Sequence, residues 1–323
     1  MRMAVIGCGL IGTKRAAAAK DHKIEIVCDP DAGRRNLLAK KTGAIPVADW
    51  RDALSAGLDA VVIATPHDQL AGISLAAVES GHHVLVEKPA GLTAEAVRPV
   101  LEASKNHEVV VKVGYNHRFH PAIMRAKELV DQGIIGPVFF IRGRYGHGGR
   151  PGYDKEWRFE PEISGGGELI DQGSHLIDLS RWFLGDLELA FGATPSFFWR
   201  PKVEDICFVA LKSASEGIAW LHASWTEWKN LFSFEIMGKT GKLSVEGLGG
   251  SYGVERLTLH HMLPEMGPPE TTIWEYPFPD NSFNIEFENF VAAVEGTSPP
   301  IGDIEDAVAN LEIVGSVYES VRS

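Results

Sequence analysis

The first third of the chain alternates between short apolar runs and stretches with helical spacing. The apolar runs lie at residues 2–6, 24–28, 58–64, 83–87 and 109–113. The stretches between them, including 31–42, 69–80 and 93–105, carry apolar residues at helical intervals. Strands that alternate with helices form βαβ units around a parallel sheet. The pattern predicts a doubly wound α/β domain over residues 1–117.

After a predicted helix at 121–132, strand-like runs follow one another directly, with one helix expected over 166–183. These runs lie at 139–147, 187–199, 205–213, 217–225, 231–237, 242–246 and 254–261. Strands at short spacing are typical of antiparallel sheets. We therefore expect an α+β domain with an open, mainly antiparallel sheet over residues 118–323. Its last helix, 303–321, can alternatively pack back onto the first domain.

Proline content makes residues 262–282 the least regular part of the predicted second domain. This segment holds Pro264, Pro268, Pro269, Pro277 and Pro279. Proline lacks an N–H for a sheet ladder and interrupts helices, so we expect irregular structure here. A helix at 283–295 follows.

Composition narrows the class of function. The 323 residues include 31 basic and 43 acidic side chains, which gives a formal net charge of −12. Binding to nucleic acid requires a basic protein surface, so we expect no nucleic-acid partner. No apolar run approaches the roughly 18–20 residues of a membrane span. Only three cysteines are present, and the N-terminus carries no pattern of a secretory leader. These features predict a cytoplasmic protein without structural disulfides.

A glycine turn follows the first predicted strand. Gly7, Gly9 and Gly12 match the G-x-G-x-x-G pattern, with a strand before it and a helix after it. In a Rossmann domain the first glycine permits the tight turn, the second admits a diphosphate and the third lets helix and strand pack closely. The helix N-terminus at Leu10 and Ile11 would present free N–H groups to the diphosphate.

Asp29 favours NAD as the dinucleotide. It ends the second strand, 22 residues beyond Gly7, where a carboxylate binds a ribose 2′-hydroxyl. The same carboxylate would repel the 2′-phosphate of NADP. Arg34 and Arg35 keep NADP open, because a nearby arginine can bind that phosphate.

Two further features point to chemistry. Lys88 follows the strand 83–87, at the sheet edge where ligands of parallel sheets bind, although a plain surface lysine would also fit this position. Asp171 and His175 are four residues apart on the predicted helix 166–183, so they share a helical face. Histidine ionises near neutrality and suits proton removal from an alcohol. A structural or surface role for this pair is the alternative.

Several of these segments resemble the Gfo/Idh/MocA family of nicotinamide-dependent sugar and cyclitol oxidoreductases. The resemblance rests on Glu87-Lys88-Pro89, on Ala64-Thr65-Pro66, on the interdomain segment 115–121 and on the glycine-rich helix 165–178. It covers essentially the whole chain and implies a Rossmann domain followed by an α/β domain. The open sheet of that second domain often forms the oligomer interface, which implies a homo-oligomer, either a dimer or a tetramer.

The resemblance also implies residue roles. Lys88 would be the catalytic lysine, and Asp171 and His175 the paired acidic and basic positions. The implied cofactor-binding residues, besides the glycine turn and Asp29, are Thr65, Pro66, Glu87, Lys88 and Asn116. The chain departs from the family pattern at His67 and Leu70, where many members carry asparagine and histidine, so the 67–70 loop supports no detailed prediction.

The loop at 147–160 is the expected specificity element. Its Trp157 and Arg158 are suited to stacking on a sugar face and to binding a carboxylate or phosphate, and Tyr145 precedes it. We therefore expect Lys88, Tyr145, Trp157, Arg158, Asp171 and His175 to bind the substrate. A solvated loop with a few packed aromatic residues is the alternative. No metal site is expected, because adjacent histidine pairs do not face one another and no cysteine or carboxylate pattern supports a zinc site.

The resulting hypothesis is hydride transfer between NAD(P) and a hydroxyl or keto group of a sugar, cyclitol or sugar derivative. His175 would accept the hydroxyl proton, Lys88 would hydrogen-bond the reacting oxygen and Asp171 would fix the geometry. Two alternatives share the fold. One is an NAD-dependent glycosidase, and the other is a non-catalytic NAD-binding regulator, which would need none of Lys88, Asp171 and His175.

Overall fold

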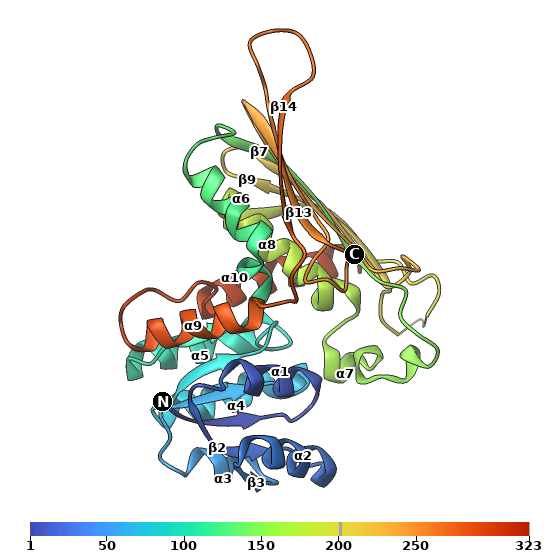
Figure 1. The fold of residues 1–323 in the computed structure, drawn as a ribbon. Coiled ribbons are helices and arrows are strands. Elements are labelled where there is room, and N and C mark those ends of the chain that lie inside the picture. Colours follow the sequence, from blue (N-terminus) through green and yellow to red (C-terminus); the bar gives the residue numbers. More distant parts are fainter. Residues whose placement is uncertain (200–201, 323) are drawn as a thin grey trace. The chain divides into compact units, whose positions relative to one another are not determined.

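The computed structural model describes residues 1–199 and 202–322, which form two compact units (Figure 1). The first unit comprises Met1–Asn116 and Phe283–Ala309. The second unit comprises His117–Ser282 and the chain from Asn310 onward. The C-terminal part of the chain therefore contributes to both units.

A six-stranded parallel sheet forms the centre of the first unit. The strand order is β3-β2-β1-β4-β5-β6, with the order reversing beside β1, as in doubly wound folds. The strands are β1 (Arg2–Ile6), β2 (Lys23–Cys28), β3 (Ile45–Val47), β4 (Ala60–Ile63), β5 (His83–Val86) and β6 (Val111–Val113). The helices between them are α1 (Leu10–Ala18), α2 (Ala32–Thr42), α3 (Trp50–Leu54), α4 (His67–Glu79) and α5 (Ala94–His107). The predicted Rossmann fold is confirmed.

Helix α9 (Ser282–Val294) completes the core of the first unit. Its Phe287 and Phe290 pack in one buried cluster with Met3, Val5 and Val62 of the sheet. This helix follows the whole second unit in the sequence, and yet its aromatic side chains fill the core of the first. The periodic pattern predicted the helix but not the unit in which its apolar face is buried.

An eight-stranded sheet forms the centre of the second unit, in the order β14-β13-β12-β11-β7-β10-β9-β8. All neighbouring pairs are antiparallel except β7 and β10, which confirms a mainly antiparallel sheet. The strands are β7 (Val138–Gly146), β8 (Leu187–Ala193), β9 (Ile206–Ser213), β10 (Ile218–Ser224), β11 (Leu231–Gly238), β12 (Gly241–Glu246), β13 (Glu255–His261) and β14 (Glu270–Tyr276).

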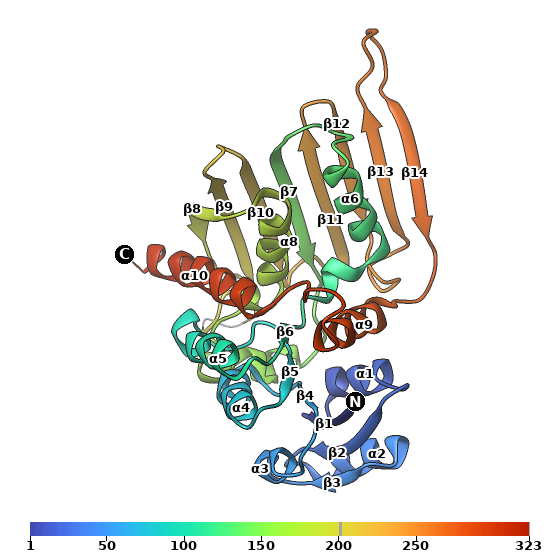
Figure 2. The same cartoon turned by 90° about the vertical axis from the view of Figure 1, so that its left-hand side faces the viewer.

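Two helices pack on one face of this sheet (Figure 2). Helix α6 (Pro121–Asp131) lies against β12, β13 and β14, and helix α8 (Ser174–Leu184) lies against β7 and β10. Shorter turns connect the elements: η1 (Asn116–Phe119), η2 (Tyr153–Lys155), η3 (Trp157–Phe159) and α7 (Pro161–Ser164). The last helix is α10 (Ile304–Ser320).

The expectation of an irregular segment over 262–282 is wrong, because β14 lies within it. The prolines stand before and after the strand, at 264–269 and 277–279, so none of them removes a hydrogen bond from the ladder with β13. The predicted strand 187–199 is also too long, since β8 ends at Ala193. The pattern missed β3 and α3, which are short; β3 also carries Pro46 at the edge of the sheet.

The helix expected over 166–183 has two parts. A π-helical turn, η4 (Leu169–Gly173), comes first, and α8 continues from Ser174. The glycines Gly165, Gly166 and Gly167 precede the turn and are outside any helix. π-Helical turns are rare and occur often at functional sites, because they change which side chains share a face.

Candidate functional site

The glycine turn between β1 and α1 has the shape of a dinucleotide cradle. Gly7 has φ +93°, and a Cβ at this position would overlap the carbonyl oxygen of Ala64. A Cβ at Gly12 would overlap the carbonyl oxygen of Gly7. At Gly9, by contrast, a Cβ would meet no atom within 4 Å. The first and third glycines are therefore required for packing, and the second faces open space that suits a diphosphate.

The start of α1 adds an anion-binding feature. No side chain caps this helix, so the N–H groups of its first turn, at Leu10 and Ile11, point beyond the helix end. The Leu10 side chain, in the same turn, is 75% exposed. Both observations fit a site whose free surface is covered when a ligand binds.

Asp29 lies at the end of β2 and is almost fully buried. Its Oδ2 accepts a hydrogen bond from the Cys8 N–H at 2.8 Å, and its Oδ1 accepts one from the Asp31 N–H at 2.9 Å. Two backbone bonds thus hold the carboxylate beside the glycine turn, and each oxygen retains a lone pair for a hydroxyl. Arg35 donates to the carbonyl oxygens of Asp29 and Pro30, at 3.2 and 2.9 Å.

Thr65 and Pro66 follow β4 and lead into α4. The Thr65 hydroxyl is buried and has no hydrogen-bond partner among the described residues. Buried polar atoms are normally paired, so an orphaned hydroxyl beside a glycine turn fits a ligand that supplies the missing partner. The first unit therefore fits a nicotinamide dinucleotide. His67 and Leu70, the departures from the family pattern, are both buried in α4.

Glu87 and Lys88 follow β5 and are both partly exposed. The Lys88–Pro89 peptide bond is cis. Glu87 Oε1 accepts a hydrogen bond from Arg15 Nε at 2.6 Å. Burial raises the pKa of Glu87, against the lowering effect of the Arg15 charge. Asn116, the last residue of this part of the first unit, is also partly exposed.

The second unit presents Asp171 from the π-helical turn η4 and His175 from the first turn of α8. The glycines before η4 pack against protein and not against open space. A Cβ at Gly166 would overlap the Tyr318 hydroxyl, and one at Gly167 would overlap the Glu204 carbonyl oxygen. Glu204 accepts hydrogen bonds from Tyr318 at 2.7 Å and from the Leu169 N–H at 3.1 Å. These contacts fix where the π-helical turn begins.

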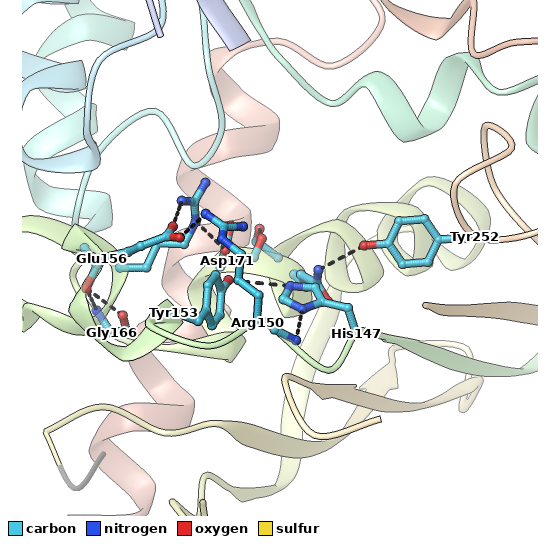
Figure 3. Close-up of polar contacts among 12 residues, drawn as sticks. His147, Arg150, Tyr153, Glu156, Gly166, Asp171 and Tyr252 are labelled. Carbon is cyan, nitrogen blue, oxygen red and sulfur yellow. Dashed lines mark hydrogen bonds and ion pairs between the residues drawn. The ribbon is translucent and has the colours of Figure 1, made fainter. Parts of the chain in front are cut away.

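Asp171 is held by a chain of ion pairs (Figure 3). Arg158 Nε donates to Asp171 Oδ2 at 3.2 Å, and Arg158 Nη1 donates to Glu156 Oε2 at the same distance. Arg150 donates to the other oxygen of Glu156. The Asp171 side chain is 14% exposed and that of Arg158 is 31% exposed, so both remain accessible to a small polar ligand.

His175 lies in a buried aromatic group. Its imidazole stacks on that of His117, with ring centroids 3.7 Å apart. Tyr145 approaches both rings edge-on, at 5.1 Å from His117 and 6.2 Å from His175. The sequence placed His117 in the interdomain segment but gave no signal that its ring would meet His175, which lies 58 residues further on.

The segment 147–160 divides into a packed part and an accessible part. Tyr153 and Phe159 are buried in a cluster with Val203 and Trp225. They support the fold and are not free to stack on a ligand. Trp157 is partly exposed, and the Arg158 guanidinium lies 4.8 Å from its ring centroid. Tyr153 and Phe159 therefore match the alternative expectation of packed aromatic residues, whereas Trp157 and Arg158 remain candidates for ligand contact.

The structure groups the predicted site residues by unit. The predicted substrate contacts other than Lys88 all belong to the second unit: Tyr145, Trp157, Arg158, Asp171 and His175. The predicted cofactor contacts belong to the first: Gly7, Gly9, Leu10, Ile11, Gly12, Asp29, Thr65, Pro66, Glu87, Lys88 and Asn116. In the described ranges, no three His, Cys, Asp or Glu residues are arranged to hold a metal ion. No helix there has the length and apolar character needed to cross a bilayer.

Comparison with known proteins identifies the family. Residues 1–115 match the model described as "Oxidoreductase family, NAD-binding Rossmann fold", and residues 123–244 match the "GFO/IDH/MocA C-terminal domain". The chain belongs to the Gfo/Idh/MocA family. The rhizopine catabolism protein MocA of Rhizobium meliloti is 30% identical, over 98% of this chain and 94% of the relative. The resemblance predicted from the motifs is confirmed.

A curated relative and a solved structure also match over the whole length of the chain. The D-glucoside 3-dehydrogenase of Escherichia coli K12 is 26% identical, over 100% of this chain and 96% of the relative. A levoglucosan dehydrogenase, solved in complex with NADH and L-sorbose, superimposes with a TM-score of 0.89 at 22% identity, over 100% and 96% of the two chains. Curated relatives include enzymes named for NAD+ and others named for NADP+.

Proposed function

We propose that this protein oxidises a hydroxyl group of a sugar, a cyclitol or a sugar derivative with NAD, and reduces the corresponding ketone in reverse. Family membership makes the chain a nicotinamide-dependent oxidoreductase of this substrate class. The observation that carries the proposal is the placement of Asp171 and His175 on consecutive turns of the second unit. These are an anchored carboxylate and a buried imidazole in a family whose first unit binds a dinucleotide.

Each side chain has a distinct role in the proposal. NAD, when bound, supplies the hydride acceptor. His175 accepts the proton of the substrate hydroxyl, because neutral imidazole is the base best matched to neutral pH. Lys88 donates a hydrogen bond to the reacting oxygen and stabilises its developing negative charge. Asp171, oriented by Arg158, accepts a hydrogen bond from the substrate and fixes its position.

The preference for NAD over NADP rests on Asp29. Its carboxylate is fixed by two backbone N–H groups at the end of β2, where a 2′-phosphate would be repelled. Arg35 is engaged with two backbone carbonyl oxygens instead of extending toward a phosphate. The local charge therefore supports binding of a ribose with a free 2′-hydroxyl.

A substrate panel tests the proposal. The full-length protein is incubated with NAD+ or NADP+ and with neutral sugars, cyclitols, sugar acids and nucleotide sugars, and nicotinamide absorbance is followed. We expect NADH to accumulate with at least one polyol, and faster than NADPH. Release of free sugar from a glycoside without net NADH would indicate a glycosidase. Binding of NADH without turnover of any substrate would indicate a regulator.

We also propose a cytoplasmic homo-oligomer that associates through the open face of the eight-stranded sheet. Helices α6 and α8 cover the other face (Figures 1 and 2). The open face carries exposed Ile218 and the parallel rings of Phe191 and Trp220, 6.2 Å apart. Apolar side chains on a flat sheet suit a self-complementary interface.

Light scattering after gel filtration measures the oligomer. We expect a dimer or tetramer, and a smaller species for Trp220→Glu. A monomeric wild-type protein at micromolar concentration would contradict this part of the proposal.

A further inference from the structure

The stacked pair of His117 and His175 joins two segments that are distant in the sequence. The ring planes are inclined by only 26°, with centroids 3.7 Å apart. His117 is 5% exposed and His175 is 4% exposed. His117 belongs to η1 at the start of the second unit, and His175 lies in the first turn of α8. The face of the proposed base is therefore covered by a second ionisable ring.

Tyr145 and Phe232 fix this pair from the sheet side. Tyr145 meets both imidazoles edge-on, and Phe232 lies 5.9 Å from the His117 ring. Burial raises the pKa of Tyr145 well above its ordinary value, so its phenol stays neutral and adds no charge to the group. Tyr145 thus packs a neutral ring edge against both imidazoles, and Phe232 packs against that of His117.

Two imidazolium rings in face-to-face contact repel one another strongly in a buried setting, so the pair binds one proton much more readily than two. The neighbouring charges differ on the two sides. On the His175 side, Asp171 is paired with Arg158 at 3.2 Å. On the His117 side, the ring centroid of His120 lies 5.7 Å from that of His117, and His120 Nδ1 lies 3.0 Å from Glu255 Oε2. Tyr145, which contacts both imidazoles, has Tyr252, Asp171 and Glu168 as its own ionisable neighbours, and Arg118, next to His117 in the chain, pairs with Asp178.

We propose that His117 is a positioning residue for His175: it holds the imidazole plane by stacking, and it takes the proton that the pair shares, so that His175 stays in its proton-accepting form. The inference rests on the proposed role of His175 as the base. The inference predicts that titration of His175 in the second unit sets the pH below which the rate of hydroxyl oxidation falls.

His117→Phe separates the two effects, because phenylalanine keeps a stacking ring and cannot bind a proton. In full-length protein labelled with 15N-histidine, the imidazole titration of His175 is followed by NMR and assigned with a His175→Asn variant. Removal of a like charge is expected to move the His175 titration upward by about one pH unit. The acidic limit of kcat for oxidation should move by the same amount, with the plateau value near that of wild type.

His117→Ala and His117→Gln complete the test. Alanine removes the stacking ring, so the plateau kcat should fall while the affinity of the first unit for NADH is unchanged. Glutamine repeats the loss of the titrating group if the phenylalanine variant does not fold. An unchanged His175 titration in a folded Phe or Gln variant would overturn the inference. The NMR readout needs no turnover, so it separates failure of this inference from failure of the proposed reaction.

Discussion

Arg15 and Glu87 form a largely buried ion pair in the first unit, with Arg15 Nε 2.6 Å from Glu87 Oε1. Arg15 comes from α1, just after the glycine turn, and Glu87 immediately precedes Lys88. The same guanidinium pairs with Glu286 of α9 and lies 4.6 Å from the Phe283 ring centroid. A single buried cation therefore connects the nucleotide turn, the segment that carries Lys88 and the returning C-terminal helix.

Replacing Arg15 with glutamine should destabilise the protein by about 3–5 kcal/mol at neutral pH, because Glu87 loses its paired cation and, among the described residues, Glu286 keeps only Lys112, 3.9 Å away. Burial already raises the pKa of Glu87, and loss of Arg15 raises it further. A carboxyl whose pKa is raised by folding weakens the folded state as the pH rises through that pKa. The deficit should therefore shrink as the pH falls toward the range where Glu87 is protonated.

Urea unfolding at several pH values measures this effect. Lys14→Gln is the matched control, because Lys14 is the exposed neighbour of Arg15 on the same helix. Its unfolding free energy should stay within roughly 0.5 kcal/mol of wild type. A deficit for Arg15→Gln that is independent of pH would contradict the assigned cause.

Asp29→Ser should weaken NADH binding roughly tenfold, since it removes the charge-assisted hydrogen bond that we propose between Asp29 and the ribose. NADPH binding should weaken less or improve, because the repulsion of its phosphate is removed. Nicotinamide fluorescence titrations give both dissociation constants. Asp31→Ser serves as the control, because Asp31 caps α2 through the Arg34 N–H and serine preserves a cap. Equal losses for the two nucleotides would show that Asp29 does not determine the preference.

Arg158→Met should lower kcat/KM for the best substrate by about tenfold or more, because Asp171 loses the cation that orients it. Arg150→Met is a close control, since Arg150 also pairs with Glu156 and its side chain is 70% exposed. An exposed pair contributes little, so its effect should stay below about twofold. If kcat/KM fell by a comparable factor in both variants, the cause would be the shared contact with Glu156 and not the orientation of Asp171.

Gly167→Ala should lower the melting temperature and also kcat, because the new methyl group overlaps the Glu204 carbonyl oxygen and displaces the start of η4. Overpacking of this kind costs about 1–3 kcal/mol. Gly72→Ala is the opposite case: Gly72 is exposed in α4, and a Cβ there meets nothing within 4 Å. That variant should gain up to about 1 kcal/mol. A stable, fully active Gly167→Ala protein would contradict the role given to the glycine run.

Local patterns in the sequence predicted the nucleotide-binding half well. The apolar runs around Gly7 and the spacing of 22 residues from Gly7 to Asp29 depend on contacts within one βαβ unit. Residues that are close in the sequence of such a unit are also close in space. Motif resemblance likewise placed Lys88, Asp171 and His175 as candidates. These features depend on short stretches of chain, and so they are visible without coordinates.

The contacts that the sequence did not predict join distant segments. The partnership of Arg15 with Glu286 spans 271 residues, and the stacking of His117 on His175 depends on where η1 meets α8. Gly166 and Gly167, which precede η4, pack against Tyr318 and Glu204, and the sequence pattern did not predict these contacts. Periodicity carries no information on such pairings, because it describes one element at a time.

The central proposal is that Lys88 and His175 each take part in oxidation of the substrate hydroxyl. The most direct measurement compares kcat for the responding polyol in wild type, Lys88→Met and His175→Ala, together with NADH affinity. We predict that kcat falls by about 10²-fold or more in each variant, as expected for loss of a group that moves or stabilises a proton. His175→Ala should bind NADH as wild type does. Wild-type turnover in either variant would contradict the account.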